Sequence, residues 1–143
     1  MEWPRPTTTV LTRALLVGAL GLCAAVPAFA AAGSKVHARL TPAAPAKHGS
    51  GTFTASGGTG KTVVVRWQLS VSNLTGPAKR AVLRTAGSRR IAFELCKPCQ
   101  STSNGQLVLL GSTWSGIVTN GGTIVVATRA HPAGELRGPL KHG

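Results

Sequence analysis

The stretch Thr123-Ile-Val-Val-Ala-Thr-Arg-Ala-His-Pro-Ala-Gly-Glu-Leu-Arg-Gly138 predicts a β-hairpin. In its first half, Val126 and Thr128 alternate with Ala127 and Arg129, as residues on the two faces of a strand do. Pro132 then presets φ for a turn, and Gly134 supplies permissive backbone before a second short run begins. The two runs should therefore pair as antiparallel strands.

A loop over residues 130–134 would fix the register of this hairpin. Two cross-strand pairs follow, Arg129 with Glu135 and Thr128 with Leu136. One face then carries the residues expected in the core, namely Val126, Thr128, Leu136 and Leu140. Glu135 lies on the other face, so we expect an exposed partner for Arg129 and not a catalytic acid.

Alternation with a period of two extends along most of the chain. The clearest run is Thr62 to Val71, in which Val63, Val65, Trp67, Leu69 and Val71 share one face. Further strands are predicted over residues 35–40, 51–56, 89–95, 106–110, 123–129 and 135–140, with Ile91, Phe93 and Leu95 inward. Turn-forming residues separate these runs, residues 41–49 are expected to form a crossing loop, and no window shows sustained helical spacing. About seven short strands predict an all-β, antiparallel sandwich or barrel.

The amino terminus predicts export. Arg5 and Arg13 precede an apolar run over residues 14–26, and Ala28-Phe29-Ala30 supplies the small residues that a signal peptidase reads. The apolar run has 13 residues, whereas a membrane span needs about 20. We therefore expect a cleaved secretory signal over residues 1–30 and one domain over residues 31–143, without a transmembrane segment. Leu22 stands before Cys23 where a lipid-attachment motif requires a small residue, which argues against a lipid anchor.

The expected mature chain is strongly basic. Of the 16 Lys and Arg residues, all but Arg5 and Arg13 remain, and they face only Glu94 and Glu135, so the formal charge is +12. Such a surface attracts polyanions non-specifically. The chain has no Tyr and few other aromatic side chains, so nothing predicts specific recognition of nucleic acid.

Five cations gather between residues 79 and 90 with no acid among them. They are Lys79, Arg80, Arg84, Arg89 and Arg90. Such a cluster repels itself and must be solvated or matched by an anionic partner. Two interpretations remain open: an anion-binding loop for phosphates or sulfated polymers, and a solvated connection. The Lys and Arg residues elsewhere, such as Lys35, Lys61 and Lys141, are expected to be dispersed.

Cys96-Lys-Pro-Cys99 contains both cysteines of the expected mature chain. In an exported protein, such a pair favours a local disulfide. A redox pair is the alternative, since Lys97 would stabilise a thiolate, but the pattern lacks the βαβ context of thioredoxin-like proteins. A zinc site is the third interpretation, although a second ligand pair is missing.

Three segments together resemble the CHRD domain, named for chordin and common in secreted microbial proteins. The order and spacing agree for Lys35-Val-His-Ala-Arg-Leu with Gly49-Ser-Gly-Thr-Phe-Thr, for Trp67-Gln-Leu-Ser-Val-Ser-Asn-Leu-Thr-Gly-Pro77, and for Ala130-His-Pro-Ala-Gly-Glu-Leu-Arg-Gly138. The resemblance implies a Greek-key-like β-sandwich of immunoglobulin-like or superoxide-dismutase-like architecture. Chordin itself is a secreted antagonist of growth factors, whereas the microbial members have no agreed activity.

One departure from that family bears on metal binding. Many members carry His-x-His-Gly after the Gly-Pro turn, but Val82 and Arg84 occupy the two histidine positions here. Neither side chain can bind a divalent metal. The four histidines after the leader are dispersed in sequence, so we expect no metal and no cofactor.

The sequence predicts a non-catalytic protein. No G-x-S-x-G motif occurs, and neither Glu94 nor Glu135 has an identifiable histidine partner in the sequence. We expect a secreted or envelope-associated interaction module that contacts anionic surface polymers or another extracellular protein. The alternative is an extracytoplasmic thiol-disulfide protein that uses Cys96 and Cys99.

Overall fold

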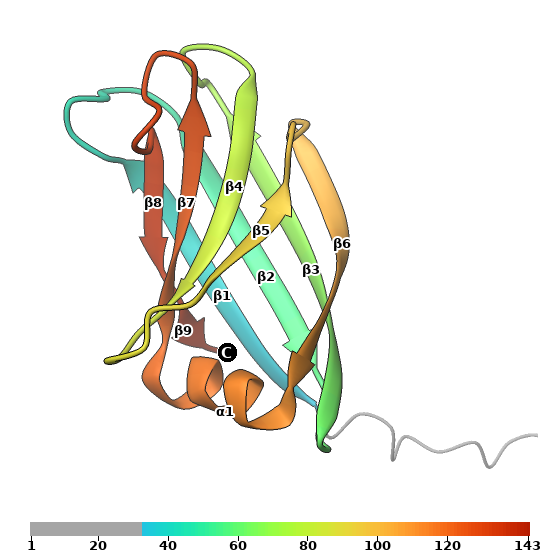
Figure 1. Ribbon diagram of the computed structural model, residues 1–143. Helices are drawn as coiled ribbons and strands as arrows, with labels where there is room; N and C mark the ends of the chain where they lie inside the picture. The colour runs from blue at the N-terminus through green and yellow to red at the C-terminus, as the bar shows by residue number, and fades with distance from the viewer. Residues whose placement is uncertain (1–32) are drawn as a thin grey trace, which may run out of the picture.

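The computed structural model describes residues 33–143, so the predicted leader, its cleavage site and Cys23 lie outside the described residues. This part of the chain forms nine strands and one helix (Figure 1). In chain order they are β1 Ser34–Pro42, β2 Ser50–Gly57, β3 Thr62–Ser72, β4 Ala78–Thr85, β5 Ala92–Cys96, β6 Thr102–Leu110, α1 Gly111–Asn120, β7 Gly122–Thr128, β8 Leu136–Pro139 and β9 Lys141–His142.

All strand pairings are antiparallel, and the strand order is β5-β4-β7-β8-β1-β2-β3-β6. Strand β1 holds the two halves together, because one edge pairs with β2 while the other pairs with β8 and β9. The sheet curls until it is nearly closed, with β5 and β6 at its two ends (Figure 1). Helix α1 lies across one end of the curled sheet.

The predicted all-β, antiparallel class is confirmed. In β3 every second residue is buried, and the five residues predicted to face the core are between 0% and 8% exposed. Burying side chains of this size stabilises the fold by about 1.5–3 kcal/mol each. The predicted loop over residues 41–49 is also present, except that β1 extends to Pro42.

The strand count and the helix differ from the predictions. Residues 33–143 contain nine strands instead of about seven, because Ala78–Thr85 and Lys141–His142 are also paired. Helix α1 was not predicted, since its ten residues bury only Trp114 and Ile117 and so carry too short a periodic pattern. The inward orientation predicted for Ile91 is wrong: its side chain is 44% exposed, because β5 begins after it.

The predicted register of the last hairpin is also wrong, by two residues. Leu136 pairs with Val126 and not with Thr128. The connection is longer because Thr128, the last residue of β7, hydrogen-bonds to His131 of the turn and not to β8: its amide donates to the His131 carbonyl at 3.3 Å, and its hydroxyl accepts from the His131 amide at 3.2 Å. A shift of two residues keeps each side chain on its face. The residues predicted for the core, Val126, Thr128, Leu136 and Leu140, are accordingly buried.

Two tryptophans fill the core where the backbone leaves room for them. Trp67 lies against Phe53, with ring centroids 6.5 Å apart, and pairs across the ladder with Gly105. A Cβ on Gly105 would lie 2.8 Å from Cζ2 of Trp67, and a Cβ on Gly57 would lie 2.8 Å from Cε2 of Trp114. The absence of a side chain at these two positions therefore admits both indoles.

Candidate functional site

The five cations predicted to share one loop do not share one. Lys79, Arg80 and Arg84 lie on β4, and only Arg89 and Arg90 lie in the connection from β4 to β5. All five side chains are exposed. Lys79 and Arg84 are five residues apart on a strand, which separates their backbones by roughly 17 Å. The cluster is therefore a line of charge that runs along β4 and continues into the connection to β5.

Strand β4 escaped prediction because bulges interrupt its alternation. The register shifts between Ala78 and Arg80 against β7, and between Ala81 and Val82 against β5. The first shift leaves two consecutive cations exposed, and three consecutive apolar residues after them are buried. At a bulge, two residues of one strand lie opposite a single residue of the partner strand. This breaks the period of two that marks a strand in the sequence.

The one exposed carboxylate side chain of residues 33–143 lies beside this line of charge. Glu94 is exposed on β5 and pairs with Val82, two residues from both Arg80 and Arg84. A carboxylate at this position lowers the positive potential that a polyanion meets at β4.

A second group of cations comes together on the opposite half of the sheet. Lys35 and Arg39 are exposed on β1, Arg66 is exposed on β3, and Lys141 is exposed on β9. Lys141 pairs with His37, which lies between Lys35 and Arg39 on the same face of β1. The prediction that Lys35 and Lys141 are dispersed is therefore wrong. The two residues are 106 positions apart in the sequence, but the pairing of β9 with β1 brings them to the same part of the sheet.

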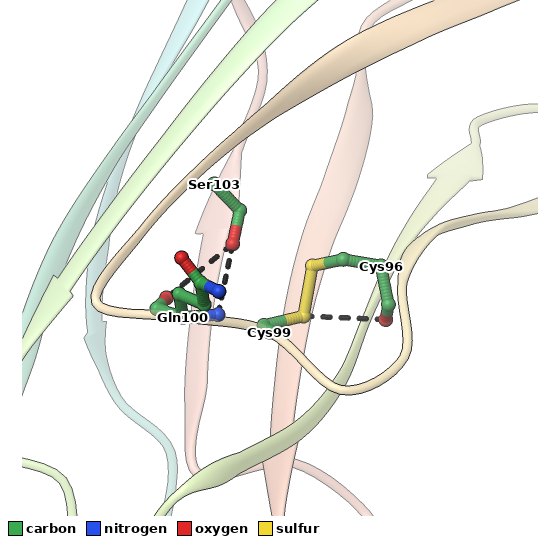
Figure 2. The surroundings of a disulfide bond; sticks show 4 residues. All are labelled: Cys96, Cys99, Gln100 and Ser103. Carbon is green, nitrogen blue, oxygen red and sulfur yellow. Dashed lines mark hydrogen bonds between the residues drawn. A yellow bond between two sulfur atoms is a disulfide. The ribbon is translucent and has the colours of Figure 1, made fainter.

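Cys96 and Cys99 form the predicted disulfide, with their Cα atoms 5.2 Å apart (Figure 2). The Sγ atom of Cys99 lies 3.2 Å from the Cys96 carbonyl oxygen, a contact without a hydrogen because the sulfur is bonded. Cys99 is 7% exposed and belongs to the core, and its amide donates to the Ala78 carbonyl at 3.1 Å. The disulfide therefore fixes the connection from β5 to β6 against the start of β4.

The residue after Cys99 begins a tight turn and not a helix. The Gln100 amide donates to the Ser103 hydroxyl at 2.9 Å, and β6 begins at Thr102 (Figure 2). The helix amino terminus that lowers a thiol pKa in thioredoxin-like pairs is absent from this position.

Glu135 occupies a different environment from the predicted exposed one. Its side chain is 0% exposed, and its Oε1 atom accepts hydrogen bonds from the Thr75 amide, at 3.0 Å, and from the Thr75 hydroxyl. Glu135 precedes β8, so the alternation of the strand does not direct its side chain outward. Its Oε2 atom is buried without a hydrogen-bond partner among the described residues.

His131 lies beside this buried carboxylate. Its Nε2 atom is 3.9 Å from Oε1 of Glu135, beyond hydrogen-bond length, and its side chain is 21% exposed. The expectation that neither glutamate has a histidine partner is therefore corrected. The turn places His131 beside Glu135, which follows it by four residues. His131 and Arg137 line a depression of about 460 Å³ together with Pro45. Since Glu135 is fully buried, its carboxylate holds loops together and has no surface for a substrate.

Within residues 33–143, no three His, Cys, Asp or Glu side chains come together as a metal-binding group. No helix in the same residues has the length and apolar character needed to cross a membrane. Comparisons with models of protein families, with curated proteins and with solved structures found no match for this chain. The function of this chain therefore has to be argued from its own residues and not from a relative.

Proposed function

We propose that this protein is a secreted or envelope-associated interaction module without catalytic activity, and that it binds anionic polymers outside the cytoplasm. One observation carries the proposal. All fourteen Lys and Arg side chains of residues 33–143 are exposed, whereas Glu94 is the one exposed carboxylate side chain there. None of those cations lies within 4.0 Å of a carboxylate in the described residues.

Burial of Glu135 contributes to this imbalance. A carboxylate inside the fold, hydrogen-bonded to Thr75, neutralises no cation on the surface. The exposed side chains therefore present an almost uniformly positive field, which raises the local concentration of anions and speeds their association. Counterion release on binding makes the affinity for a polyanion fall steeply as salt rises.

The resemblance to the CHRD domain supports the extracellular setting, and we propose the Greek-key-like sandwich as the corresponding fold. In support, β4, β5 and β6 follow one another in the chain, and β7 returns through α1 to pair with β4. A fourth strand that returns to lie beside the first of three is one element of a Greek key, although β6 here pairs with β3 and not with β5.

The test measures binding of the purified protein to heparin, to inorganic polyphosphate and to neutral dextran. We expect binding to both anionic polymers at low salt, weaker binding at physiological salt, and no binding to dextran. Equal binding to dextran and heparin, or absence of binding to both polyanions at low salt, would contradict the proposed function.

A further inference from the structure

The second group of cations lies on a regular grid. Strand β1 presents Lys35, His37 and Arg39 outward at every second position, which are about 7 Å apart along the strand. Lys141 of β9 is opposite His37. Arg66 of β3 stands in the row of Lys35, two strands away, or about 10 Å. These cations are therefore arranged on one continuous face of the sheet, which we name the β1–β3 face.

Neutral polar side chains continue the same rows across β2, β3 and β6. They are Thr52, Thr54, Ser56, Gln68, Ser70, Thr102, Asn104 and Gln106. None of them makes a side-chain hydrogen bond to another described residue. These rows also contain no Asp or Glu side chain. The β1–β3 face thus offers free hydroxyl and amide groups beside uncompensated positive charge.

The face is hollowed where the two kinds of side chain meet. A depression of about 610 Å³ is lined by Lys35 and Arg66 together with Thr54, Gln68 and Asn104. A second one, of about 510 Å³, is lined by His37, Arg39 and Lys141 on the β1 side. Both depressions share His37, so they form neighbouring positions along one surface.

The line of charge on β4 lacks this chemistry. Glu94 lies on the outer face beside Val82, and Val82 pairs in turn with Val125. A polymer on that face would meet the Glu94 carboxylate between the cations, where the β1–β3 face offers hydroxyl and amide groups. The two basic groups therefore differ in what surrounds the charge.

We propose that the β1–β3 face binds a linear anionic polysaccharide, an inference that rests on the proposed function and names its site and ligand class. The cations would contact carboxylate or sulfate groups, and the hydroxyl and amide side chains would exchange hydrogen bonds with sugar hydroxyls. Nucleic acid does not fit, because the face has no Phe, Tyr or Trp side chain for bases to stack on: Phe53 and Trp67 point inward and are buried.

Two variants with equal loss of charge test the location. The first is Lys35→Gln with Arg39→Gln and Arg66→Gln, and the second is Arg84→Gln with Arg89→Gln and Arg90→Gln. All six side chains are exposed, so both variants should fold, which circular dichroism checks. We expect the first variant to lower the slope of log affinity for heparin against log salt by about 2–3, and the second by less than about 1.

A third variant tests the ligand class without changing charge. Thr54→Ala with Gln68→Ala and Asn104→Ala should weaken heparin binding at least about fivefold and leave polyphosphate binding within about twofold, because polyphosphate has no sugar hydroxyls. Equal losses for the two polymers would show recognition of charge alone and would overturn the polysaccharide assignment.

Lysine acetylation of the wild-type protein gives a readout that needs no mutation. Bound heparin should protect Lys35 and Lys141 and leave Lys79 and Lys97 reactive. Protection of Lys79 with reactive Lys35, or equal losses in the two charge variants, would overturn the β1–β3 face while the proposed function stands. A wild-type protein that binds no polyanion would instead remove the proposed function and this inference together.

Discussion

Glu135 accepts two hydrogen bonds from Thr75, a residue sixty positions earlier, through one carboxylate oxygen. The backbone of Glu135 adds two further links, since its amide donates to the Val126 carbonyl at 2.7 Å and its carbonyl accepts from the Ala43 amide at 2.8 Å. One residue thus joins the loop before β4, strand β7 and the connection from β1 to β2. The Glu135 side chain is itself fully buried, which limits the competition of water for its carboxylate.

This relationship predicts a large loss of stability when the carboxylate is removed. Glu135→Ala should lower the free energy of unfolding by about 3 kcal/mol, because it removes charge-assisted hydrogen bonds and leaves the Thr75 donors without their acceptor. Thr75→Val, which removes only the hydroxyl donor, should cost about 1–1.5 kcal/mol. Urea denaturation measures both variants. Glu94→Ala is the control for loss of an exposed carboxylate, with an expected change within about 0.5 kcal/mol.

A double-mutant cycle over the same pair separates the hydrogen bonds from general disruption. The combined Thr75→Val and Glu135→Ala variant should lose less stability than the two single losses added together, with a coupling of about 0.5–3 kcal/mol. Strict additivity would show that the two side chains do not interact in solution.

The disulfide is predicted to stabilise the fold and not to take part in binding. Cys96→Ser with Cys99→Ser should cost about 2 kcal/mol on the loop-entropy model and lower the melting temperature by about 10 °C. Heparin affinity and its salt dependence should be unchanged, because Cys99 packs into the core and neither cysteine lines the depressions of the β1–β3 face. Calorimetry and a heparin titration measure the two effects. Catalytic reduction of insulin by the wild type, with a redox potential near those of thiol oxidoreductases, would favour the thiol-disulfide function instead.

Two glycines predict stability changes of opposite sign. Gly105→Ala places a Cβ 2.8 Å from Cζ2 of Trp67, so overpacking should destabilise the protein by about 1–3 kcal/mol. Gly116→Ala places its Cβ in open space within α1, where higher helix propensity should stabilise by about 0.5–1 kcal/mol. Thermal unfolding followed by tryptophan fluorescence compares the pair. Equal shifts in one direction would contradict the close packing of Trp67 on Gly105.

Export can be tested on the residues of the predicted leader. Secreted protein should begin at or within a few residues of Ala31, as measured by intact mass. Ala28→Leu with Ala30→Leu should block cleavage, whereas Ala31→Leu, directly after the predicted site, should not. A secreted species that retains Cys23 with an attached lipid would contradict this processing.

Local patterns in the sequence determined the strands and the disulfide. The alternation from Val63 to Val71 reports burial on one face of a strand, a property that depends only on neighbouring residues. Cys96 and Cys99 are close enough in the chain to bond whatever the rest of the fold does. Strand β4 was not predicted because its bulges remove this local pattern, although it pairs with β5 and β7 in the fold.

The tertiary structure alone decided which distant residues meet. The β1–β3 face exists because β9 returns to β1, which places Lys141 opposite His37, and because β2 pairs with both β1 and β3, which places Arg66 in the row of Lys35. Register and strand order arise from packing between segments far apart in the chain, so no local spacing encodes them. The burial of Glu135 has the same origin: its partner Thr75 comes from another loop, and the hydrogen bonds form only when both loops are at the same end of the sheet.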